Sequence, residues 1–453
     1  MNHYTRFSPR ASLGAVGRHM RQEGMWHSVE RHVHIRQKVV KYIPTDKLLD
    51  GFVNILAGGH GLVEVNTRVR TDEALQRAFG RTACADQSTI SDTLNACTEE
   101  NVTQMGQALQ ELYRIHGLGY GHNYEEQCQL LDVDLTGMPA GQKGEGVTKG
   151  YFRDKKNRRG RQLGRVMATL YDEIVVERLY PGNRQLERSL QGLIVAAEEV
   201  LDLNEARRKR TIIRVDGGGG RDADVNWLLA RGYQVLVKVK NWKRAAKLAR
   251  SVQSWHTDPK TGDRQVGRVE RPHAYVRPTR QVAIRTPRKD GSWLHWVLVC
   301  SLADEQLCEL ARQPVRRNAT PLQMAFTTLH AYDLRSGGVE TSIKGSKQGL
   351  GLTKRNKKRF VAQLMLVLLA QLAYNLLTWT RRQLARHAKR LQRLGPLRMI
   401  RDLFHIPGRI ELDAQGRVLE ITLCEAHALA LPFAQAFSSL LAQDGLSLNL
   451  GQI

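Results

Sequence analysis

The sequence predicts an α/β fold with a helical N-terminal region and a β-rich insertion that interrupts the core. Residues 1–125 show helical periodicity, residues 126–240 alternate β-like with helical segments, and residues 241–327 are again β-like. With 453 residues, the chain exceeds the size at which one hydrophobic core stops growing, so we expect several structural units. The predicted boundaries are 1–125, 126–240, 241–327, 328–392 and 393–453.

The N-terminal region contains two helical patterns. KLLDGFVNILAGGHGLVEV (47–65) predicts an amphipathic helix capped by Thr45-Asp46, and residues 85–117 predict a short helix, a turn and a long helix. The segment QSTISDTL (87–94) would suit the recognition helix of a helix-turn-helix, which would make this region the part that binds DNA ends. A simple helical bundle is the alternative.

The core pattern begins near residue 126. Residues 128–137 predict a strand, and residues 164–182 predict two strands joined by Tyr171-Asp172-Glu173. A helix follows at 184–203, then a buried strand at 211–216, a helix at 222–232 and a strand at 233–240. This succession of strands and helices is typical of an α/β sheet.

The insertion and the C-terminal part have their own signals. Residues 280–301 alternate on both sides of Asp290-Gly291, which predicts a hairpin. Helix is expected from about 330 to about 392, with a glycine-broken stretch at 345–351. The tail predicts a second hairpin at 409–423 and a helix near 430–442. The insertion also holds four of the seven tryptophans, Trp242, Trp255, Trp293 and Trp296.

The charge balance indicates a polyanionic partner. Lys and Arg number 69 against 44 acids, which gives a net charge of +25 and a pI near 10.1. Nucleic acid is the first candidate partner, and a generally basic soluble protein is the alternative. The six cysteines are scattered and form no CxxC pair, so we expect reduced thiols and a cytoplasmic protein.

One apolar segment is long enough to span a bilayer. FVAQLMLVLLAQLAYNLLTW (360–379) lies between basic residues, as a membrane helix would. Gln363, Gln371 and Asn375, however, fall within one arc of a helix. A polar stripe on an apolar helix favours a buried core helix, so no membrane is expected.

A single aspartate followed by four glycines stands at the end of the strand IIRVD (212–216). A Walker loop would need Lys and Ser or Thr after the glycines, but Arg221 and Asp222 follow. A dinucleotide fingerprint would place no carboxylate before the glycines, because it would repel the pyrophosphate. A metal ligand is the remaining interpretation, and the glycines would then let a DNA strand approach.

Three carboxylates are candidates for one metal site. Asp134 ends the first β-like run and Asp216 ends the fourth, and ligands gather at the carboxyl ends of strands in α/β sheets. Glu340 is the best third acid. Asp132 competes for the same role because it is predicted to share a face with Asp134. Two-metal phosphoryl transfer needs such converging carboxylates.

Basic and aromatic residues surround these acids in the sequence. Tyr332, Arg335 and Lys347 flank Glu340, as suits a site for cations and phosphate. The run KGYFRDKKNRRGRQLGR (149–165) holds eight Lys or Arg in 17 residues and is expected to form a loop. A solvated loop is the alternative to DNA contact. The candidate DNA-contacting residues of the run are Arg153, Lys155, Lys156, Arg158, Arg159 and Arg161.

The motifs LLDVDLTGMPAG, IIRVDGGGG and Y-x2-R…E-x6-K resemble the DDE transposases of bacterial insertion sequences. The match is to the insertion-sequence-four-like group, which has a Tyr–Arg–Glu–Lys signature and a β-strand insertion before the last acid. It covers about residues 126–390. Four residues separate Arg335 from Glu340 where the family has three, which is either a small bulge or a displacement of Arg335.

The resemblance implies an RNase H-like core whose first acid ends the first strand, whose second acid ends the fourth, and whose third acid lies on a helix after the insertion. Asp134, Asp216 and Glu340 would hold two Mg²⁺ ions, for which Mn²⁺ could substitute. Tyr332, Arg335 and Lys347 would bind terminal phosphates. A homodimer on double-stranded DNA would cut and join the element's ends, and relatives stack a flipped base on an insertion-domain Trp.

Three functions remain open at this point. The chain is an active transposase, a catalytically silent or domesticated DNA-binding relative, or a two-metal nuclease without strand transfer.

Overall fold

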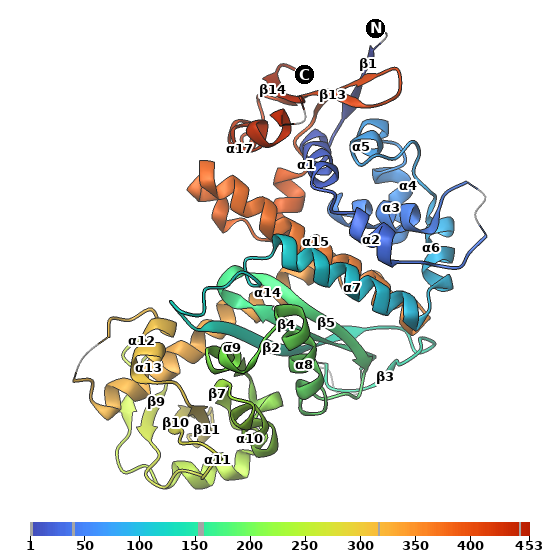
Figure 1. The fold of residues 1–453 in the computed structure, drawn as a ribbon. Coiled ribbons are helices and arrows are strands. Elements are labelled where there is room, and N and C mark those ends of the chain that lie inside the picture. The colour runs from blue at the N-terminus through green and yellow to red at the C-terminus, as the bar shows by residue number, and fades with distance from the viewer. Residues whose placement is uncertain (1–2, 39–40, 153–157, 316–317, 444) are drawn as a thin grey trace. The chain divides into compact units, whose positions relative to one another are not determined.

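The computed structural model describes residues 3–38, 41–152, 158–315, 318–443 and 445–453. The chain divides into two compact units (Figure 1). The first comprises Met1–Gly117, Met138–Arg161 and Ile343–Ile453, and the second comprises Leu118–Gly137 and Gln162–Ser342. The fold is mixed α/β, as the sequence predicts, and it contains two sheets.

The first unit is built around one long helix, α15 (Phe360–His387), against which α3, α6, α7 and α17 pack. Its small sheet has the strand order β1-β12-β13-β14. The bounds of its remaining elements are α1 Ala11–Gln22, α2 His27–His32, α3 Pro44–Leu56, α4 Val65–Arg68, α5 Glu73–Ala78, α6 Gln87–Ala96, α7 Glu99–His116, α16 Pro396–Arg398, α17 Ala430–Ala442, β1 His3–Ser8, β3 Thr148–Lys149, β12 Gly408–Asp413, β13 Val418–Cys424 and β14 Ser447–Gly451.

Helix α15 contains the apolar segment 360–379, which the sequence analysis found long enough to span a membrane. By length and composition it could cross a bilayer, but 83% of its most apolar 18-residue window is buried inside the structure. Gln363, Gln371 and Asn375 are buried with it. Burial of the polar stripe within the unit supports the core-helix interpretation.

The second unit contains most of the larger sheet, in which β5 pairs with β4 and the other strands follow the order β4-β2-β6-β7-β11-β10-β9-β8. The bounds are β2 Gln129–Pro139, β4 Arg159–Ala168, β5 Glu173–Pro181, β6 Thr211–Val215, β7 Gln234–Lys238, β8 His256–Thr257, β9 Gln265–Arg268, β10 Arg280–Pro287, β11 Trp293–Cys300, α8 Leu190–Leu201, α9 Glu205–Lys209, α10 Asp222–Ala230, α11 Trp242–Ala249, α12 Asp304–Leu310, α13 Pro321–Asp333 and α14 Val339–Gln348. The last two residues of β2, the first three of β4 and the last six of α14 belong to the first unit.

The centre of this sheet is parallel and buried. β2 pairs with β6, and β6 with β7, both in parallel. The sequence TIIRV of β6 is buried at every position, as expected for a central strand covered on both faces. One core cluster joins Leu130, Ile212 and Leu236 of these strands to Leu307 of α12 and Met324 of α13.

Most predicted elements are confirmed, and the differences have local causes. Helix α3 starts at Pro44, which occupies the first helical position, so Thr45-Asp46 lies inside the first turn and is not the cap. α13 begins at Pro321 behind a Thr320 capping box, earlier than the predicted start near 330. β1 was not expected, and it forms by pairing with β12.

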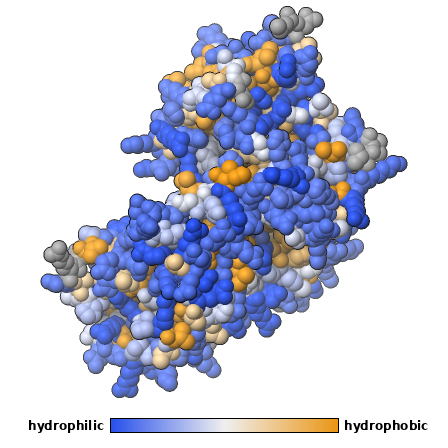
Figure 2. Space-filling model, viewed as in Figure 1, coloured by the Kyte–Doolittle hydropathy of each residue, from blue (hydrophilic) through white to orange (hydrophobic). Residues whose placement is uncertain are grey.

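The surface visible in Figure 2 is largely hydrophilic, with small scattered hydrophobic patches. This agrees with a charged content of 25% and a net charge of +25.

The glycine run after β6 is required by packing within the chain. A Cβ at Gly220 would lie 1.8 Å from the Lys238 carbonyl oxygen, and one at Gly219 would lie 2.5 Å from Val215 Cγ1. A Cβ at Gly218 would lie 2.9 Å from Asp216 Oδ1, whereas one at Gly217 would meet Lys238 Cδ only at 3.8 Å. Close approach of β7 therefore explains Gly220, and only Gly217 has room for a side chain.

The run yields a matched pair of substitutions. Gly220→Ala should lower the free energy of unfolding by about 3 kcal/mol or more, because the new methyl group overlaps a backbone carbonyl that cannot move alone. Gly217→Ala should change it by about 0.5 kcal/mol at most. Urea denaturation of the three proteins checks this, and equal losses for both variants would contradict it.

Candidate functional site

Two of the three predicted acids stand side by side at the point where the parallel pairing of two strands ends. In the register of β2 and β6, Val133 faces Val215, and Asp134 and Asp216 are the next residues. Asp216 directly follows β6, as predicted, whereas Asp134 lies within β2, which continues to Pro139, so the prediction that Asp134 ends its strand is wrong. Neighbouring strands lie about 4.8 Å apart, so the two carboxylates emerge at one edge of the sheet. The condition on which the sequence prediction depended, that these strands are neighbours, is met.

Asp132 does not share the role of Asp134. Its side chain is fully buried, and Arg214 of β6 donates to both of its oxygens at 2.6 and 2.8 Å. Thr169 donates a further hydrogen bond of 2.8 Å. These contacts neutralise the charge of Asp132 inside the sheet. Asp134 is therefore the acid of this strand that is available to bind a metal ion.

The third acid is linked to the first by a guanidinium. Arg335 lies in the short 3₁₀ helix Leu334–Gly337, and its Nη2 is 3.0 Å from Asp134 Oδ2. Its Nη1 donates to Glu340 Oε1 in the first turn of α14. Asp134 is 16% exposed and Glu340 is 52% exposed. The extra residue between Arg335 and Glu340 is thus accommodated, since the two side chains still meet.

The charges of Asp216 and Glu340 both act on Asp134, so the three acids are electrostatically linked. Burial raises the pKa of Asp134 to about 6, and the charges of Asp216 and Glu340 raise it as well, while Arg335 opposes them. Burial tends to lower the pKa of Arg335, but Asp134 and Asp216 raise it overall. Arg335 is therefore the counter-ion of the cluster, and the acids repel one another without it.

Lys238 is a cation at this edge that the sequence analysis missed. In the register of β6 and β7, Val215 faces Val237, so Lys238, the last residue of β7, lies level with Asp216, which directly follows β6. Burial lowers the pKa of Lys238, and Asp216 opposes that shift. The available signal was the predicted strand 233–240, which ends in lysines directly after the second acid's strand and helix.

Aromatic rings line the same neighbourhood. Lys238 Nζ lies 4.7 Å from the centroid of the Trp296 ring, which is 6.2 Å from the ring of Tyr332. Burial raises the pKa of Tyr332, with Asp216 and Glu340 adding to the shift. Trp242, by contrast, is 71% exposed, and Trp255 and Trp293 stack against Arg285. Among the four insertion tryptophans, Trp296 is the one in contact with the surroundings of the acids.

The remaining predicted residues lie elsewhere. Lys347 is on α14, seven residues beyond Glu340, in the part of the helix that belongs to the first unit. Arg158 is exposed, and Arg159 begins β4 half-buried. Arg153, Lys155 and Lys156 fall outside the residues that the structure describes.

Arg161, which the sequence suggested as a DNA contact, is 1% exposed. Its Nε donates to the Glu145 carbonyl at 2.7 Å, and its Nη1 and Nη2 donate to the carbonyls of Lys357 and Lys358 at 3.0 and 2.8 Å. In this structure the guanidinium holds two chain segments together.

Whether the acids fit a metal depends on donor type and arrangement. Their oxygens are the donors that Mg²⁺ prefers, and three converging negative charges need a cation, so the donor set fits. Among residues whose placement is described, no three His, Cys, Asp or Glu side chains stand close enough to hold an ion, because the Arg335 guanidinium lies between Asp134 and Glu340. A bound ion would compete with this guanidinium for the same carboxylates.

The counter-ion role of Arg335 is testable by stability. Arg335→Gln should lower the free energy of unfolding by about 3 kcal/mol at pH 8, because it leaves the largely buried Asp134 carboxylate unpaired. Asp134 is protonated in the folded state below about pH 6, so the loss should be smaller at pH 5. Urea denaturation at both pH values measures it, with Arg335→Lys as the charge-preserving control. Equal losses at the two pH values would contradict the assignment.

Comparison with known proteins gives the family. The family model described as "Transposase DDE domain group 1" matches residues 14–444. No curated protein matches the chain. A solved structure, the piggyBac transposase synaptic complex with hairpin DNA, has a TM-score of 0.45 and 9% identity, covering 98% of this chain and 84% of that chain. Since the family match spans nearly the whole sequence, the chain belongs to the DDE transposase domain family, whose members generally use divalent metals.

Proposed function

We propose that the protein is an active transposase that binds the ends of an insertion sequence and catalyses metal-dependent DNA cleavage and strand transfer. The observation that carries the proposal is the position of Asp134 and Asp216 on adjacent parallel strands, with Glu340 joined to Asp134 through Arg335. Two-metal phosphoryl transfer needs three such acids.

The order of elements supports an RNase H-like core. Apart from the two-residue β3, the strands run β2, β4, β5 and β6 along the chain, with Asp134 within the first of them and Asp216 directly after the fourth. Glu340 lies on α14, after the strands β8 to β11 of the insertion region. This is the order that the insertion-sequence transposases have.

Each residue then has a role. Asp134, Asp216 and Glu340 would hold two Mg²⁺ ions, or Mn²⁺ in their place. When bound, such ions activate the attacking oxygen and stabilise the leaving oxygen. Lys238, Arg335 and Lys347 supply positive charge to phosphate oxygens, and Tyr332 positions the DNA terminus. Water attacks phosphorus first and releases a 3′-hydroxyl, and that hydroxyl then attacks a target phosphodiester, so one phosphorus–oxygen bond forms as another breaks.

The partner is double-stranded DNA, both at the element ends and at the target. The net charge of +25 and the exposed Arg158 support this. We further propose a homodimer that pairs the two ends.

The decisive experiment is cleavage of DNA that carries the sequence flanking this gene, with and without Mg²⁺. Asp134→Asn, Asp216→Asn and Glu340→Gln should each reduce cleavage at least about a hundredfold, because each removes a charged group needed in the transition state. Binding of the ends should stay close to that of wild type. Loss of end binding in all three variants would mean that the acids serve folding.

The same assay separates the alternatives. Binding without cleavage by wild type would favour the catalytically silent relative. Cleavage without a joined product, measured with a labelled 3′-hydroxyl end and a target plasmid, would favour the nuclease.

The basic run makes a separate prediction. Replacing Arg158 and Arg159 with Gln should weaken binding to DNA of every sequence. The slope of the logarithm of the binding constant against the logarithm of the salt concentration should become shallower by about 1.8, because each phosphate contact contributes about 0.9. Gln at the exposed Arg386 and Arg390 is the matched control. An unchanged slope, measured by fluorescence anisotropy, would remove these two residues from the DNA-binding surface.

A further inference from the structure

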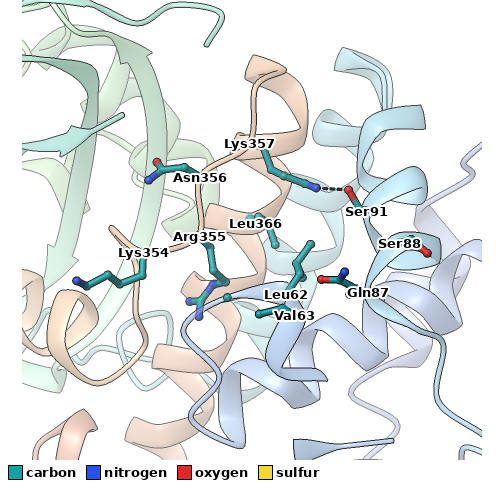
Figure 3. A pocket seen from close by; sticks show the side chains of 11 residues that line it. Leu62, Val63, Gln87, Ser88, Ser91, Lys354, Arg355, Asn356, Lys357 and Leu366 are labelled. Carbon is teal, nitrogen blue, oxygen red and sulfur yellow. Dashed lines mark hydrogen bonds between the residues drawn. The ribbon is translucent and has the colours of Figure 1, made fainter. Parts of the chain in front are cut away.

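The first unit contains a pocket that none of the three acids lines (Figure 3). Its volume is about 430 Å³, within the range of ligand-binding pockets. One wall is the N-terminal half of α6, with Gln87, Ser88 and Ser91, and the other is the segment 354–357. The two walls come from opposite ends of the sequence, and both belong to the first unit.

The lining of this pocket is cationic. Lys354, Arg355 and Lys357 contribute three positive charges, and no lining residue is acidic. Three acids lie close to it in the sequence. Asp86 caps α6 by accepting from Ser88 and Thr89, and Glu64 accepts from Arg68 and from backbone N–H groups. Asp92 is exposed on α6 and acts on Lys357, opposing the effect of burial on the pKa of that lysine.

The segment 355–358 is held rigidly by its backbone. Gln363 of α15, which is 1% exposed, accepts from the Lys357 N–H at 2.8 Å and donates to the Arg355 carbonyl at 3.0 Å. Arg161 donates to the next two carbonyls, those of Lys357 and Lys358. The backbone is therefore fixed before any ligand arrives, which lowers the entropic cost of binding.

The cations of the pocket divide into two kinds. Arg355 is buried, and its guanidinium donates to the carbonyls of Gly59 and Leu350, so it serves the structure. Lys354 is exposed at the rim. Lys357 is half-buried and reaches across to the Ser91 hydroxyl, as Figure 3 shows. Burial lowers the pKa of Lys357, which means that its ammonium lacks the hydration it would have in water.

We propose that this pocket binds the sugar–phosphate backbone of DNA, with Lys354 and Lys357 contacting phosphate oxygens and the Ser91 hydroxyl, which accepts from Lys357, donating its own proton to them. Amines and hydroxyls are groups by which proteins hold phosphates. Such contacts carry no base information, so α6 acts by positioning DNA. The inference rests on the proposed function, because the phosphate is taken to belong to DNA and not to a free anion.

The test is DNA binding by the full chain carrying both Lys354→Gln and Lys357→Gln. The matched control is Lys38→Gln with Lys389→Gln, which removes the same charge from exposed lysines of the same unit outside the pocket. Fluorescence anisotropy is recorded with an element-end duplex and a scrambled duplex over a range of salt concentrations. The pocket variant should bind both duplexes about tenfold more weakly or worse, with a slope shallower by about 1.8, while the control matches wild type.

Other outcomes overturn the proposal. The proposal is overturned if the salt dependence of DNA binding by the pocket variant has the same slope as that of the control. It is also overturned if the pocket variant binds only one of the two duplexes more weakly, because contacts to the DNA backbone act on all sequences. If inorganic phosphate raises the melting temperature of wild type but not of the pocket variant, while the DNA slope is unchanged, the pocket takes a free anion instead. If the double variant unfolds, the single variant Lys354→Gln, at an exposed position, replaces it in the test. The slope of its log–log salt dependence of DNA binding should then be shallower than that of wild type by about 0.9.

Cleavage by wild type, measured in parallel, separates the two proposals. Cleavage with an unchanged slope in the pocket variant overturns this inference alone. Failure of wild type to bind DNA overturns both the inference and the proposed function.

Discussion

The parallel register of β2, β6 and β7 is the constraint on which the acidic site depends. Val133, Val215 and Val237 are aligned across the three strands, so the residues that follow them, Asp134, Asp216 and Lys238, emerge together at one edge. Buried β-branched runs hold this register, since a shift by one residue would turn every side chain to the opposite face. Gly220 contributes because it allows the chain after β6 to pass against the carbonyl of Lys238.

A second constraint is charge balance at that edge. Burial raises the pKa of Asp134 to about 6, and the charges of Asp216 and Glu340 raise it further. The buried Arg335 guanidinium opposes this shift and balances part of the negative charge. Arg335 is thus part of how the site folds as well as a candidate phosphate ligand. The two roles are compatible, because a guanidinium that moves from carboxylates to a phosphate keeps an anionic partner throughout.

The sequence predicted the order of elements and the position of both aspartates because these depend on local patterns. Strands such as TIIRV and the Asp290-Gly291 hairpin carry their signal within a few residues. It did not predict β1, whose pairing with β12 depends on residues about 400 positions away in the chain. The burial of Arg161 and the ion pair of Asp132 were missed for the same reason: a charge looks alike in sequence whether its partner is water or a distant carbonyl.

The two aspartates of β2 differ in their surroundings because Arg214 pairs with one of them and not with the other. Asp132 is paired inside the sheet with Arg214, whereas Asp134 faces the site edge. In an evolving family, positions 132 and 214 should therefore change together or remain unchanged together, since either charge alone would be stranded in the core. Position 134 has its partner, Arg335, outside the sheet in the 3₁₀ helix Leu334–Gly337, so a change at 134 would be compensated at 335 and not at 214.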